Sequence, residues 1–367
     1  MSTDGDLDRI LRDAFEAKAR SAVDDDRVAP GLGVRSVRPR NVAAPARKPI
    51  RSLAPLAAAV AVVLAVGLVL AIRTSTTTDG QPATVGSSHG AFAPQPTAAA
   101  SKPSLPITTV HVMLKWSDGS QFGVGVPVIA YLSRKITDAR PFARATTVTV
   151  NGSPVAGAWY FETSAAVAGY PLEAHYRLRD YWPAHAKVSV KLPVKGLSAG
   201  AGLAFDDSLT LDFSTGAANV ATVDDLKHTL TLVSDGTTVG SYPVSLGARS
   251  TPTARGTKVI MEKGVSICMR GPGYYECGVK YTQRLTYGGE YLHAAPWNLA
   301  NLGNTDTSNG CTNLSPADAA VLYRLLEIGD LVNYPNANGP AMKLAAGYGD
   351  WNVAWSTWLT GGAVATR

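Results

Sequence analysis

Cysteine is scarce in this sequence of 367 residues, which contains only Cys268, Cys277 and Cys311. No two of them form a Cys-x-x-Cys unit, so the sequence does not indicate a structural zinc site, and we expect no metal and no cofactor. In an exported chain two cysteines can pair, which leaves the third as a reactive thiol. The odd count therefore directs attention to the cysteine that stays unpaired.

Charged residues are also few, at 17% of the sequence, and the net charge of +6 is modest. A hydrophobic content of 46% excludes a disordered chain and describes a globular protein with an additional apolar segment. Much of the positive charge lies between Arg35 and Arg51. This position favours an anionic membrane surface over nucleic acid as a partner, and it fits a simple topology signal equally well.

A long uncharged hydrophobic run spans Leu53–Ile72. Twenty helical residues rise about 30 Å, which is enough to cross the hydrocarbon core of a bilayer. The basic residues before the run place the N-terminus in the cytoplasm and the bulk of the chain on the outer side of the cell membrane. A cleaved signal peptide is the alternative, but the run begins about fifty residues into the chain and is long for such a peptide. We therefore expect an uncleaved, single-pass anchor.

The length leaves room for two or three folded domains, and we find no internal repeat. A short amphipathic helix is expected near the N-terminus, either docked on a membrane or partner or without a dedicated partner. The segment after the hydrophobic run is rich in Pro, Thr and Ala and is typical of a flexible linker. The expected organisation is a cytoplasmic segment at 1–51, a transmembrane helix at 52–73, a linker at 74–106, β-rich domains at 107–216 and 217–340, and a Trp-rich segment at 341–367 that packs on the second β-rich domain.

Residues 107–216 contain short apolar runs separated by turn residues. The seven candidate strands are Val110–Trp116, Val126–Leu132, Thr146–Val150, Trp159–Glu162, Leu172–Arg177, Lys187–Lys191 and Ser208–Phe213. Short strands separated by Gly, Pro and Asp predict a β-sandwich of immunoglobulin type. The histidines of this region, including His175, are assigned no chemistry.

Residues 217–340 also have the pattern of a mostly β domain with one clear helix. Ser315 is expected to cap this helix, with Pro316 at its first position, Asp318 in its first turn and Gly329 beyond its end. The predicted fold class is therefore mainly β: a transmembrane helix, an immunoglobulin-like β-sandwich and a β-rich domain with one main helix.

The last segment carries Trp351, Trp355 and Trp358 at helical spacing. A stripe of this kind indicates packing in a core more than stacking on carbohydrate.

The stretch Gly289–Leu314 carries the strongest chemical signal, because it places His293 and Cys311 on turn-rich backbone. A cysteine with a pKa of about 8.5 is mostly protonated at neutral pH, and only its thiolate attacks acyl groups. A nearby imidazole can take the thiol proton and return it to the leaving group. A buried, inert cysteine and a structural histidine are the alternatives, and the polar loop around Cys311 argues against the first.

These residues resemble the signature of the L,D-transpeptidases, cysteine enzymes that form 3→3 cross-links in bacterial peptidoglycan. The family pattern is a His, a spacer, Ser/Thr-His-Gly-Cys, one residue and Asn. Here 14 residues separate His293 from the run Ser308-Asn309-Gly310-Cys311-Thr312-Asn313. The single departure is Asn309, which stands where the family usually has His. The resemblance covers the chain from about Asn219 to its end, and a sandwich before the catalytic domain is similar to the actinobacterial members.

The resemblance implies a role for each matching residue. Cys311 is the nucleophile, and His293 is the general base and acid, oriented by the main-chain carbonyl of Ala294. The N–H groups of Gly310 and Cys311 are candidates for the oxyanion site. The domain at 217–340 is then the catalytic domain.

Three side chains of the loop are expected at the substrate. Ser308 and Asn313 are expected to order the loop by hydrogen bonds. Asn309 can donate and accept hydrogen bonds but cannot carry charge. It therefore predicts a shifted pH dependence or reduced activity.

A flap over the groove is expected at Lys263–Lys280. A hairpin centred between Pro272 and Gly273 places Cys268 opposite Cys277, close enough for a disulfide if the strands are in register. Two reduced thiols are the alternative.

Aromatic residues of the flap and loop are candidates for contact with substrate. Tyr275, its neighbour Tyr274, and Trp297 are expected to line the groove, although aromatic packing explains them as well.

The activity implied by the resemblance is a ping-pong acyl transfer between peptidoglycan stem peptides, a donor tetrapeptide and an acceptor, and carbapenems are expected to acylate Cys311. The alternatives are an L,D-carboxypeptidase, attachment of a protein to the wall through the same acyl-enzyme, or an impaired wall-binding module, which Asn309 would favour. We expect no nucleic acid partner.

Overall fold

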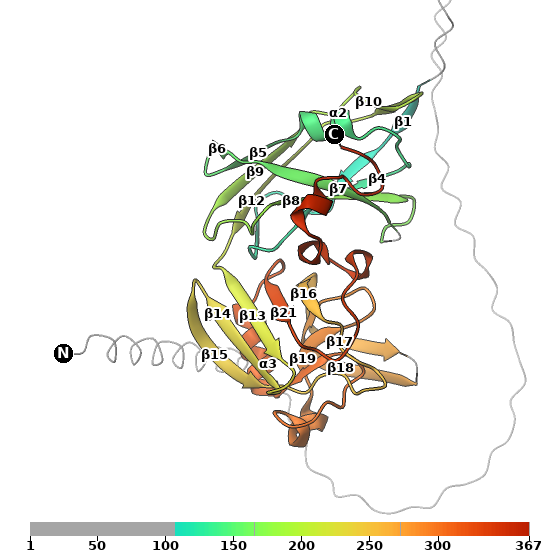
Figure 1. Ribbon diagram of the computed structural model, residues 1–367. Helices are drawn as coiled ribbons and strands as arrows, with labels where there is room; N and C mark the ends of the chain where they lie inside the picture. The colour runs from blue at the N-terminus through green and yellow to red at the C-terminus, as the bar shows by residue number, and fades with distance from the viewer. Residues whose placement is uncertain (1–106, 165, 272, 367) are drawn as a thin grey trace, which may run out of the picture. The chain divides into compact units, whose positions relative to one another are not determined.

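The computed structural model of the protein describes residues 107–164, 166–271 and 273–366. The N-terminal helix, the transmembrane helix at 52–73 and the linker at 74–106 that the sequence predicts lie outside these residues. Within the described ranges, no helix is long and apolar enough to cross a membrane. The described chain is mainly β, with few and short helices (Figure 1).

The first half of the described chain is a sandwich of two main sheets. One sheet has the order β2-β4-β8-β7, and the other has the order β3-β12-β9-β5-β6. The bounds are β2 (Val112–Leu114), β4 (Val128–Leu132), β8 (Leu172–Leu178), β7 (Gly157–Thr163), β3 (Ser120–Phe122), β12 (Leu209–Thr215), β9 (Lys187–Leu192), β5 (Thr147–Val150) and β6 (Ser153–Pro154).

Smaller elements complete the sandwich. A third sheet joins β1 (Thr108–Val110), β11 (Leu203–Phe205) and β10 (Ser198–Gly200), and a short helix α2 (Arg140–Ala145) precedes β5. The sequence analysis did not identify β3, β6, β10, β11 or α2, because elements of two to six residues carry too few apolar positions to show a period.

Alternation along the strands builds the sandwich core. Along β9, Val188, Val190 and Leu192 are buried while the residues between them are not. The centre of the core holds Phe142 of α2 against Trp159, with ring centroids 5.1 Å apart in an edge-to-face arrangement. All residues of β4 are buried, because its two faces contact different cores, which is typical of a strand covered on both sides.

The second half is built from two sheets and one main helix. The first sheet has the order β15-β14-β13-β21-β16, and the second has the order β17-β18-β19-β20. The bounds are β13 (Asn219–Asp224), β14 (Thr229–Ser234), β15 (Thr237–Pro243), β16 (Gly256–Val259), β17 (Glu262–Gly271), β18 (Tyr274–Arg284), β19 (Tyr291–Ala294), β20 (Thr312–Leu314) and β21 (Leu331–Tyr334).

Helix α3 (Pro316–Leu325) begins where the sequence predicts and ends earlier. The side chain of Ser315 accepts a hydrogen bond from the backbone N–H of Asp318, and Pro316 occupies the first turn. The helix buries Ala319 and Leu322, which join the core that also contains residues of β13, β14 and β19. Gly329 lies beyond the end of the helix, as the sequence predicts, but it does not cap it: Leu326 already has extended backbone, and Gly329 lies in the turn before β21.

The C-terminal segment differs from its prediction. Only its first part lies on the catalytic half, where Met342 N–H donates to Arg255 O and Tyr287 N–H donates to Ala346 O. Its later part, red in Figure 1, reaches the sandwich, where Gly362 bridges to Phe161 of β7. The expectation that all of 341–367 packs on the catalytic domain is therefore wrong.

The three tryptophans are not on one helix, because short helices η4 (Asp350–Asn352) and α4 (Trp355–Trp358) are separated by extended backbone at Val353. All three rings surround the guanidinium of Arg177 on β8, at 4.4 to 5.2 Å from the ring centroids. Packing and cation–π attraction thus hold the segment on the sandwich.

Candidate active site

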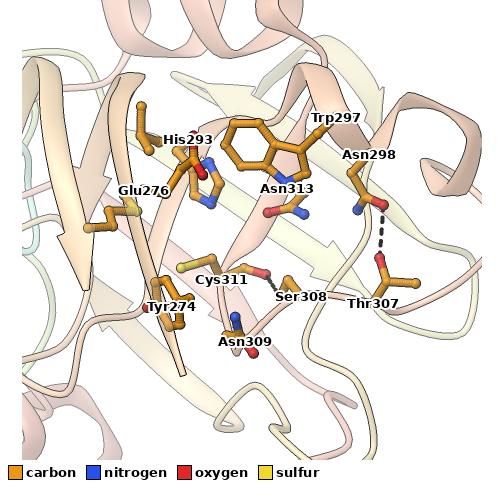
Figure 2. Close-up of a pocket in the computed structure, with 12 residues that line it drawn as sticks. Tyr274, Glu276, His293, Trp297, Asn298, Thr307, Ser308, Asn309, Cys311 and Asn313 are labelled. Atoms are coloured by element: carbon orange, nitrogen blue, oxygen red, sulfur yellow. Dashed lines mark hydrogen bonds between the residues drawn. The ribbon is translucent and has the colours of Figure 1, made fainter. Parts of the chain in front are cut away.

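The catalytic residues meet because two short strands run side by side in parallel. Strands β19 and β20 pair with Leu292 opposite Thr312 and His293 opposite Asn313. Cys311 immediately precedes β20, so it lies beside the first residue of β19, two residues before His293 on that strand. Figure 2 shows both side chains at one cavity of about 300 Å³.

His293 is held in one orientation by its own backbone neighbour. Its Nδ1 lies 2.9 Å from the carbonyl oxygen of Ala294, so Nδ1–H donates and the second ring nitrogen, Nε2, is the basic atom. Burial lowers the pKa of His293, and this hydrogen bond partly opposes that shift. The imidazole is therefore neutral at pH 7 and able to accept a proton.

Cys311 is the free cysteine of the described chain and is only 5% exposed. Its Sγ–H donates to the carbonyl oxygen of Gly289 at 3.5 Å. Burial raises the pKa of the Cys311 thiol to about 12, although the neighbouring Lys258 charge acts in the opposite direction. The resting site is therefore a neutral thiol beside a neutral imidazole, and reaction requires transfer of the thiol proton to a base.

Ser308 orders the loop that carries the nucleophile. Its hydroxyl donates to the carbonyl oxygen of Cys311 at 2.6 Å and accepts from the N–H of Gly310 at 3.1 Å. Gly310 has a φ of 105°, a left-handed conformation that a side chain would strain. These contacts give Ser308 the loop-ordering position that the sequence predicts.

The same contacts change the assignment of the oxyanion donors. Because Gly310 N–H is engaged by Ser308, the prediction that it is free to bind an oxyanion does not fit this geometry. The N–H of Cys311 makes no hydrogen bond within the described ranges and is the better candidate.

The two asparagines of the motif occupy different environments. Asn309 is exposed and lines the cavity, in the place that the family usually gives to His. Asn313 also lines the cavity but is buried, and its Oδ1 has no hydrogen-bond partner among the described residues. A buried oxygen without a partner at a cavity wall is suited to accept a hydrogen bond from a bound substrate.

The flap contributes one wall of the cavity. Met269, Tyr274, Glu276 and Val279 of β17 and β18 face the catalytic pair. Tyr275, which the sequence analysis assigned to the substrate, is 70% exposed and does not line the cavity. The reason is the alternation of side chains along β18, which turns Tyr274 inward and Tyr275 outward.

Trp297 does line the cavity, as expected. Its ring is 57% exposed, and its centroid lies 6.0 Å from that of His293. An exposed indole beside a catalytic group offers an apolar surface to a substrate.

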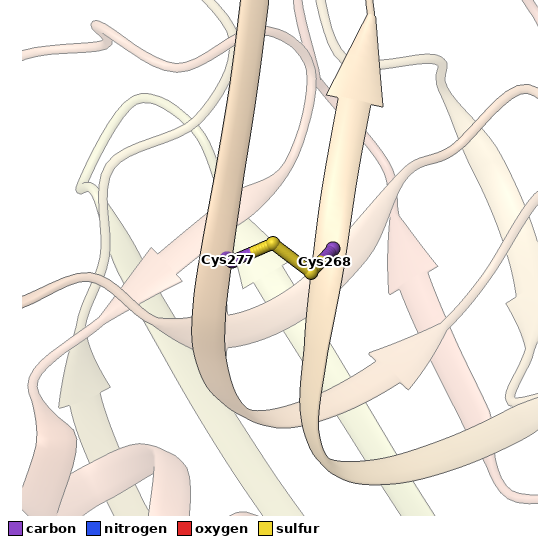
Figure 3. Close-up of a disulfide and its surroundings, with 2 residues drawn as sticks. All are labelled: Cys268 and Cys277. Atoms are coloured by element: carbon purple, nitrogen blue, oxygen red, sulfur yellow. A yellow bond between two sulfur atoms is a disulfide. The ribbon is translucent and has the colours of Figure 1, made fainter. Parts of the chain in front are cut away.

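The flap strands are joined by a disulfide between Cys268 and Cys277 (Figure 3). Met269 pairs with Glu276 and Gly271 with Tyr274, which is the register that the sequence analysis uses to place the two cysteines together. The register shifts at the disulfide itself, between Ile267 and Met269.

A buried ion pair beneath the nucleophile was not predicted. Lys258 of β16 is fully buried, and its Nζ lies 2.5 Å from Glu290 Oε2 and 3.9 Å from the ring centroid of Tyr334. Glu290 Oε1 accepts from the N–H of Ala254, so both partners are satisfied. The signal in the sequence was a single lysine before the apolar run Val-Ile-Met, in a strand with no other charge.

Comparisons with known proteins agree with this geometry. A family model described as an L,D-transpeptidase catalytic domain matches residues 218–333, and a bacterial Ig domain model matches 93–198. L,D-transpeptidase 2 of Mycobacterium tuberculosis is 32% identical over 285 residues, which cover 75% of this chain and 67% of that protein. L,D-transpeptidase 5 of the same species is 31% identical over 264 residues, which are 70% of this chain and 57% of that protein.

A solved structure of an LD transpeptidase in complex with imipenem has a TM-score of 0.50 and 28% identity, over 62% of this chain and all of that one. The flap and the pair His293 and Cys311 lie within the segment that the catalytic family model matches. The sandwich lies in the domain before it, which the Ig model matches in large part. The chain therefore belongs to the L,D-transpeptidase family and is an enzyme that acts as a transpeptidase.

Proposed function

We propose that the protein forms 3→3 cross-links between peptidoglycan stem peptides through an acyl-enzyme on Cys311. The observation that carries this proposal is the pair of side chains in Figure 2: a thiol and an imidazole at one cavity, with the imidazole oriented by Ala294 O. The thiol supplies the nucleophile and the imidazole the proton acceptor that an acyl transfer needs.

Acylation begins with proton transfer from Cys311 Sγ to His293 Nε2. The thiolate attacks the carbonyl carbon of the third residue of a donor tetrapeptide, expected to be meso-diaminopimelate. The oxyanion that forms is stabilised by the N–H of Cys311. The C–N bond then breaks, and the terminal D-Ala leaves with the proton that His293 returns.

Deacylation reverses these roles. His293 accepts a proton from the side-chain amine of an acceptor stem as the amine attacks the thioester. The C–S bond breaks, the new amide forms, and the proton passes to the Cys311 sulfur. The open side of the cavity beside Trp297 is where the acceptor enters in this proposal, because this ring is the most exposed aromatic side chain of the wall.

The remaining expectations concern location. The uncharged run Leu53–Ile72 and the basic residues before it support a single-pass anchor with the N-terminus in the cytoplasm. The linker at 74–106 would then carry the sandwich and the catalytic domain into the cell wall, where the stem peptides are.

Water in place of the acceptor amine would give an L,D-carboxypeptidase, and the amine of a protein would give wall attachment. The exposed Asn309 in place of His is the observation that favours a catalytically impaired wall-binding module. The buried His293, oriented by Ala294 O, favours catalysis instead.

The test is the intact mass of the full-length chain after incubation with imipenem. We expect a single adduct on the parent and none on Cys311→Ala, because only the activated thiol opens the lactam. Cys268 and Cys277 remain in both proteins as internal controls. Donor and acceptor stem peptides then separate cross-linking from hydrolysis. A folded parent with reduced Cys311 and no adduct would contradict the proposal.

A further inference from the structure

A buried cluster in the sandwich, far along the chain from the catalytic loop, has no role in the reaction. Glu162 on β7 and Glu173 and His175 on β8 are all buried, and each points one ligand atom into a group whose atoms lie within 4.8 Å of one another. Glu162 and Glu173 are directly opposite each other in the β7–β8 ladder, and His175 follows two residues later on the same face.

The carboxylates of this cluster outnumber the protein cations that face them, because Glu162, Glu173 and Asp350 all lie at the one imidazole of His175. Two carboxylates directly opposite each other across a ladder repel, and burial strengthens the repulsion. Within the described ranges, no lysine or arginine forms an ion pair with Glu162 or Glu173.

The imidazole of His175 is aimed into the cluster with its outer nitrogen free. Its Nε2 is buried and has no hydrogen-bond partner among the described residues. This atom lies 3.7 Å from Glu162 Oε1 and 3.8 Å from Glu173 Oε1. Both separations exceed the roughly 2.7–3.2 Å of a hydrogen bond, so a proton on Nε2 would make no hydrogen bond to either carboxylate.

The same separations fit a metal ion. Ligand bonds of about 2.0–2.2 Å in a tetrahedral zinc site place neighbouring ligand atoms about 3.3–3.6 Å apart. The separations of 3.7 and 3.8 Å at His175 Nε2 are a few tenths of an ångström longer, so binding would draw the three side chains slightly together.

The other ring nitrogen has the partner that a metal-binding histidine usually has. His175 Nδ1 lies 2.8 Å from Oδ1 of Asp350, which is fully buried, so Nδ1–H donates to a carboxylate and Nε2 is the ring atom left to bind a metal. A carboxylate that orients a histidine in this way is typical of the outer shell of zinc sites. Glu173 is held similarly, because its Oε2 accepts from Ser164 Oγ at 2.9 Å.

We propose that Glu162, Glu173 and His175 bind a divalent transition metal ion, with zinc the best match, and that the ion fastens the C-terminal segment to the sandwich through Asp350. Mixed imidazole and carboxylate ligands suit zinc and its neighbours more than calcium or magnesium, which take oxygen ligands. The sequence analysis expected no metal because it considered only the spacing of the cysteines. The residues of this cluster include no cysteine, and Asp350 is far from the other three in sequence.

A route to the site exists. Glu173 lines a cleft of about 740 Å³ together with Lys115, Tyr131 and Tyr287. The hydroxyl of Tyr287 is buried without a partner in the described part of the chain, and so is that of Tyr348, whose ring centroid lies 6.1 Å from that of His175. Groups of this kind are available to a water that completes the coordination of the ion.

The experiment measures zinc bound by the tag-free, full-length chain in a Cys311→Ala background, which keeps the catalytic thiol from binding the metal. The protein is stripped with EDTA, incubated with zinc at pH 7.5 and dialysed, and its zinc content is measured by atomic emission. We expect about one zinc per chain to be lost in His175→Ala and in the nearly isosteric Glu162→Gln. Zinc should also raise the melting temperature of the Cys311→Ala chain but not that of Glu162→Gln.

The matched control is His228→Ala. His228 lies with Asp225 and Asp306 in a second cluster of the same composition, but two of its three residues are only partly buried. We expect this variant to bind as much zinc as its parent. The proposal is overturned if the folded parent binds no more zinc than Glu162→Gln, or if zinc is lost in His228→Ala instead.

Discussion

At the scale of single residues, the buried pair Lys258–Glu290 shows how a charge can be kept beneath the nucleophile. Lys258 is fully buried, and its charge opposes the rise in the pKa of Cys311, while Glu290 adds to that rise. The two effects act in opposite directions, and burial is the larger cause of the shift. The pair also fixes the local backbone, because Glu290 Oε1 accepts a hydrogen bond from the N–H of Ala254.

We expect Lys258→Met to destabilise the full-length chain by about 3 kcal/mol, because it leaves the partly buried Glu290 carboxylate without its partner. The double variant Lys258→Met/Glu290→Gln should recover most of this loss, since the new side-chain amide is neutral and its oxygen can still accept from Ala254 N–H. Urea unfolding of the parent, the single and the double variants measures both effects. Equal stability of the single and double variants would show that the charge of Glu290 is not the cause.

The pKa shifts of the catalytic pair predict a pH profile. Burial lowers the pKa of His293 below its ordinary 6.5, so the base form persists into mild acid. Burial raises the pKa of Cys311 to about 12, so no appreciable free thiolate forms up to pH 9. The rate of acylation by imipenem should therefore be flat from about pH 7 to 9 and fall only in acid, as His293 protonates.

Intact mass at timed intervals from pH 5 to 9 gives this profile, with the free amino acid cysteine as the control. The control rate should rise roughly tenfold per pH unit below its thiol pKa, because only thiolate reacts. A similar rise for the enzyme would show that Cys311 reacts as an exposed thiolate without His293.

At the scale of elements, the flap illustrates how local pairing prepares the site. Strands β17 and β18 are long but largely exposed, so little apolar burial holds them together. The disulfide Cys268–Cys277 closes a short loop at their end and restricts the unfolded chain. It lies beside Met269 and Glu276, which face the cavity.

We expect the double variant Cys268→Ser/Cys277→Ser to lose about 2–3 kcal/mol of stability, the value for a loop of this length. Chemical unfolding under non-reducing conditions measures the loss. Thiol counting of the denatured parent should give one free thiol, that of Cys311. Three free thiols would contradict the bridge, and an unchanged stability would show that the hairpin needs no link.

Local chemistry explains which elements the sequence could predict. The start of α3 follows from Ser315 and Pro316 alone, and the flap register follows from the positions of two cysteines. The pairing of His293 and Cys311 was recognised from motif spacing. The ion pair Lys258–Glu290 could not be predicted in the same way, because Lys258 lies on β16 of one sheet and Glu290 directly before β19 of the other, and they meet only in the folded domain.

Tyr274 rather than Tyr275 faces the cavity because the register of the β17–β18 pair shifts between Ile267 and Met269. No residue of the flap indicates this shift in the sequence. The end of the C-terminal segment was predicted to pack on the wrong domain because its partner is distant in sequence. Its tryptophans pack on Arg177, a residue more than 170 positions earlier, and helical spacing says nothing about a partner so distant.

At the scale of the whole described molecule, the sandwich and the catalytic half share a core. Ile129 and Tyr131 of β4 belong to the same buried cluster as Val259, Met261 and Leu331 of the catalytic half. Backbone contacts reinforce this junction: Gly123 N–H donates to Ile328 O, and Gly125 N–H donates to Gly329 O. Two halves joined through a shared apolar core and backbone hydrogen bonds are expected to unfold together.

Gly123 is the position where this coupling is most easily broken. A Cβ there would lie 2.2 Å from both the backbone N and the Oδ1 of Asp330, and 2.4 Å from the backbone C of Gly329. Since two of these atoms are backbone, Gly123→Ala must push the two loops apart and lose the hydrogen bond to Ile328. We expect a loss of about 1–3 kcal/mol and a calorimetric transition of the folded halves that broadens or divides in two.

Gly288→Ala is the control for this change. Its Cβ would meet only the Thr286 hydroxyl, at an ordinary 3.7 Å, so its stability should stay within about 0.5 kcal/mol of the parent. The imipenem reaction of Gly123→Ala tells whether the junction also supports catalysis. The rate should stay near that of the parent, because Cys311, His293 and the flap all lie in the catalytic half and make their contacts there. A single, unshifted transition in Gly123→Ala would mean that the loops separate freely and that the shared core alone joins the halves.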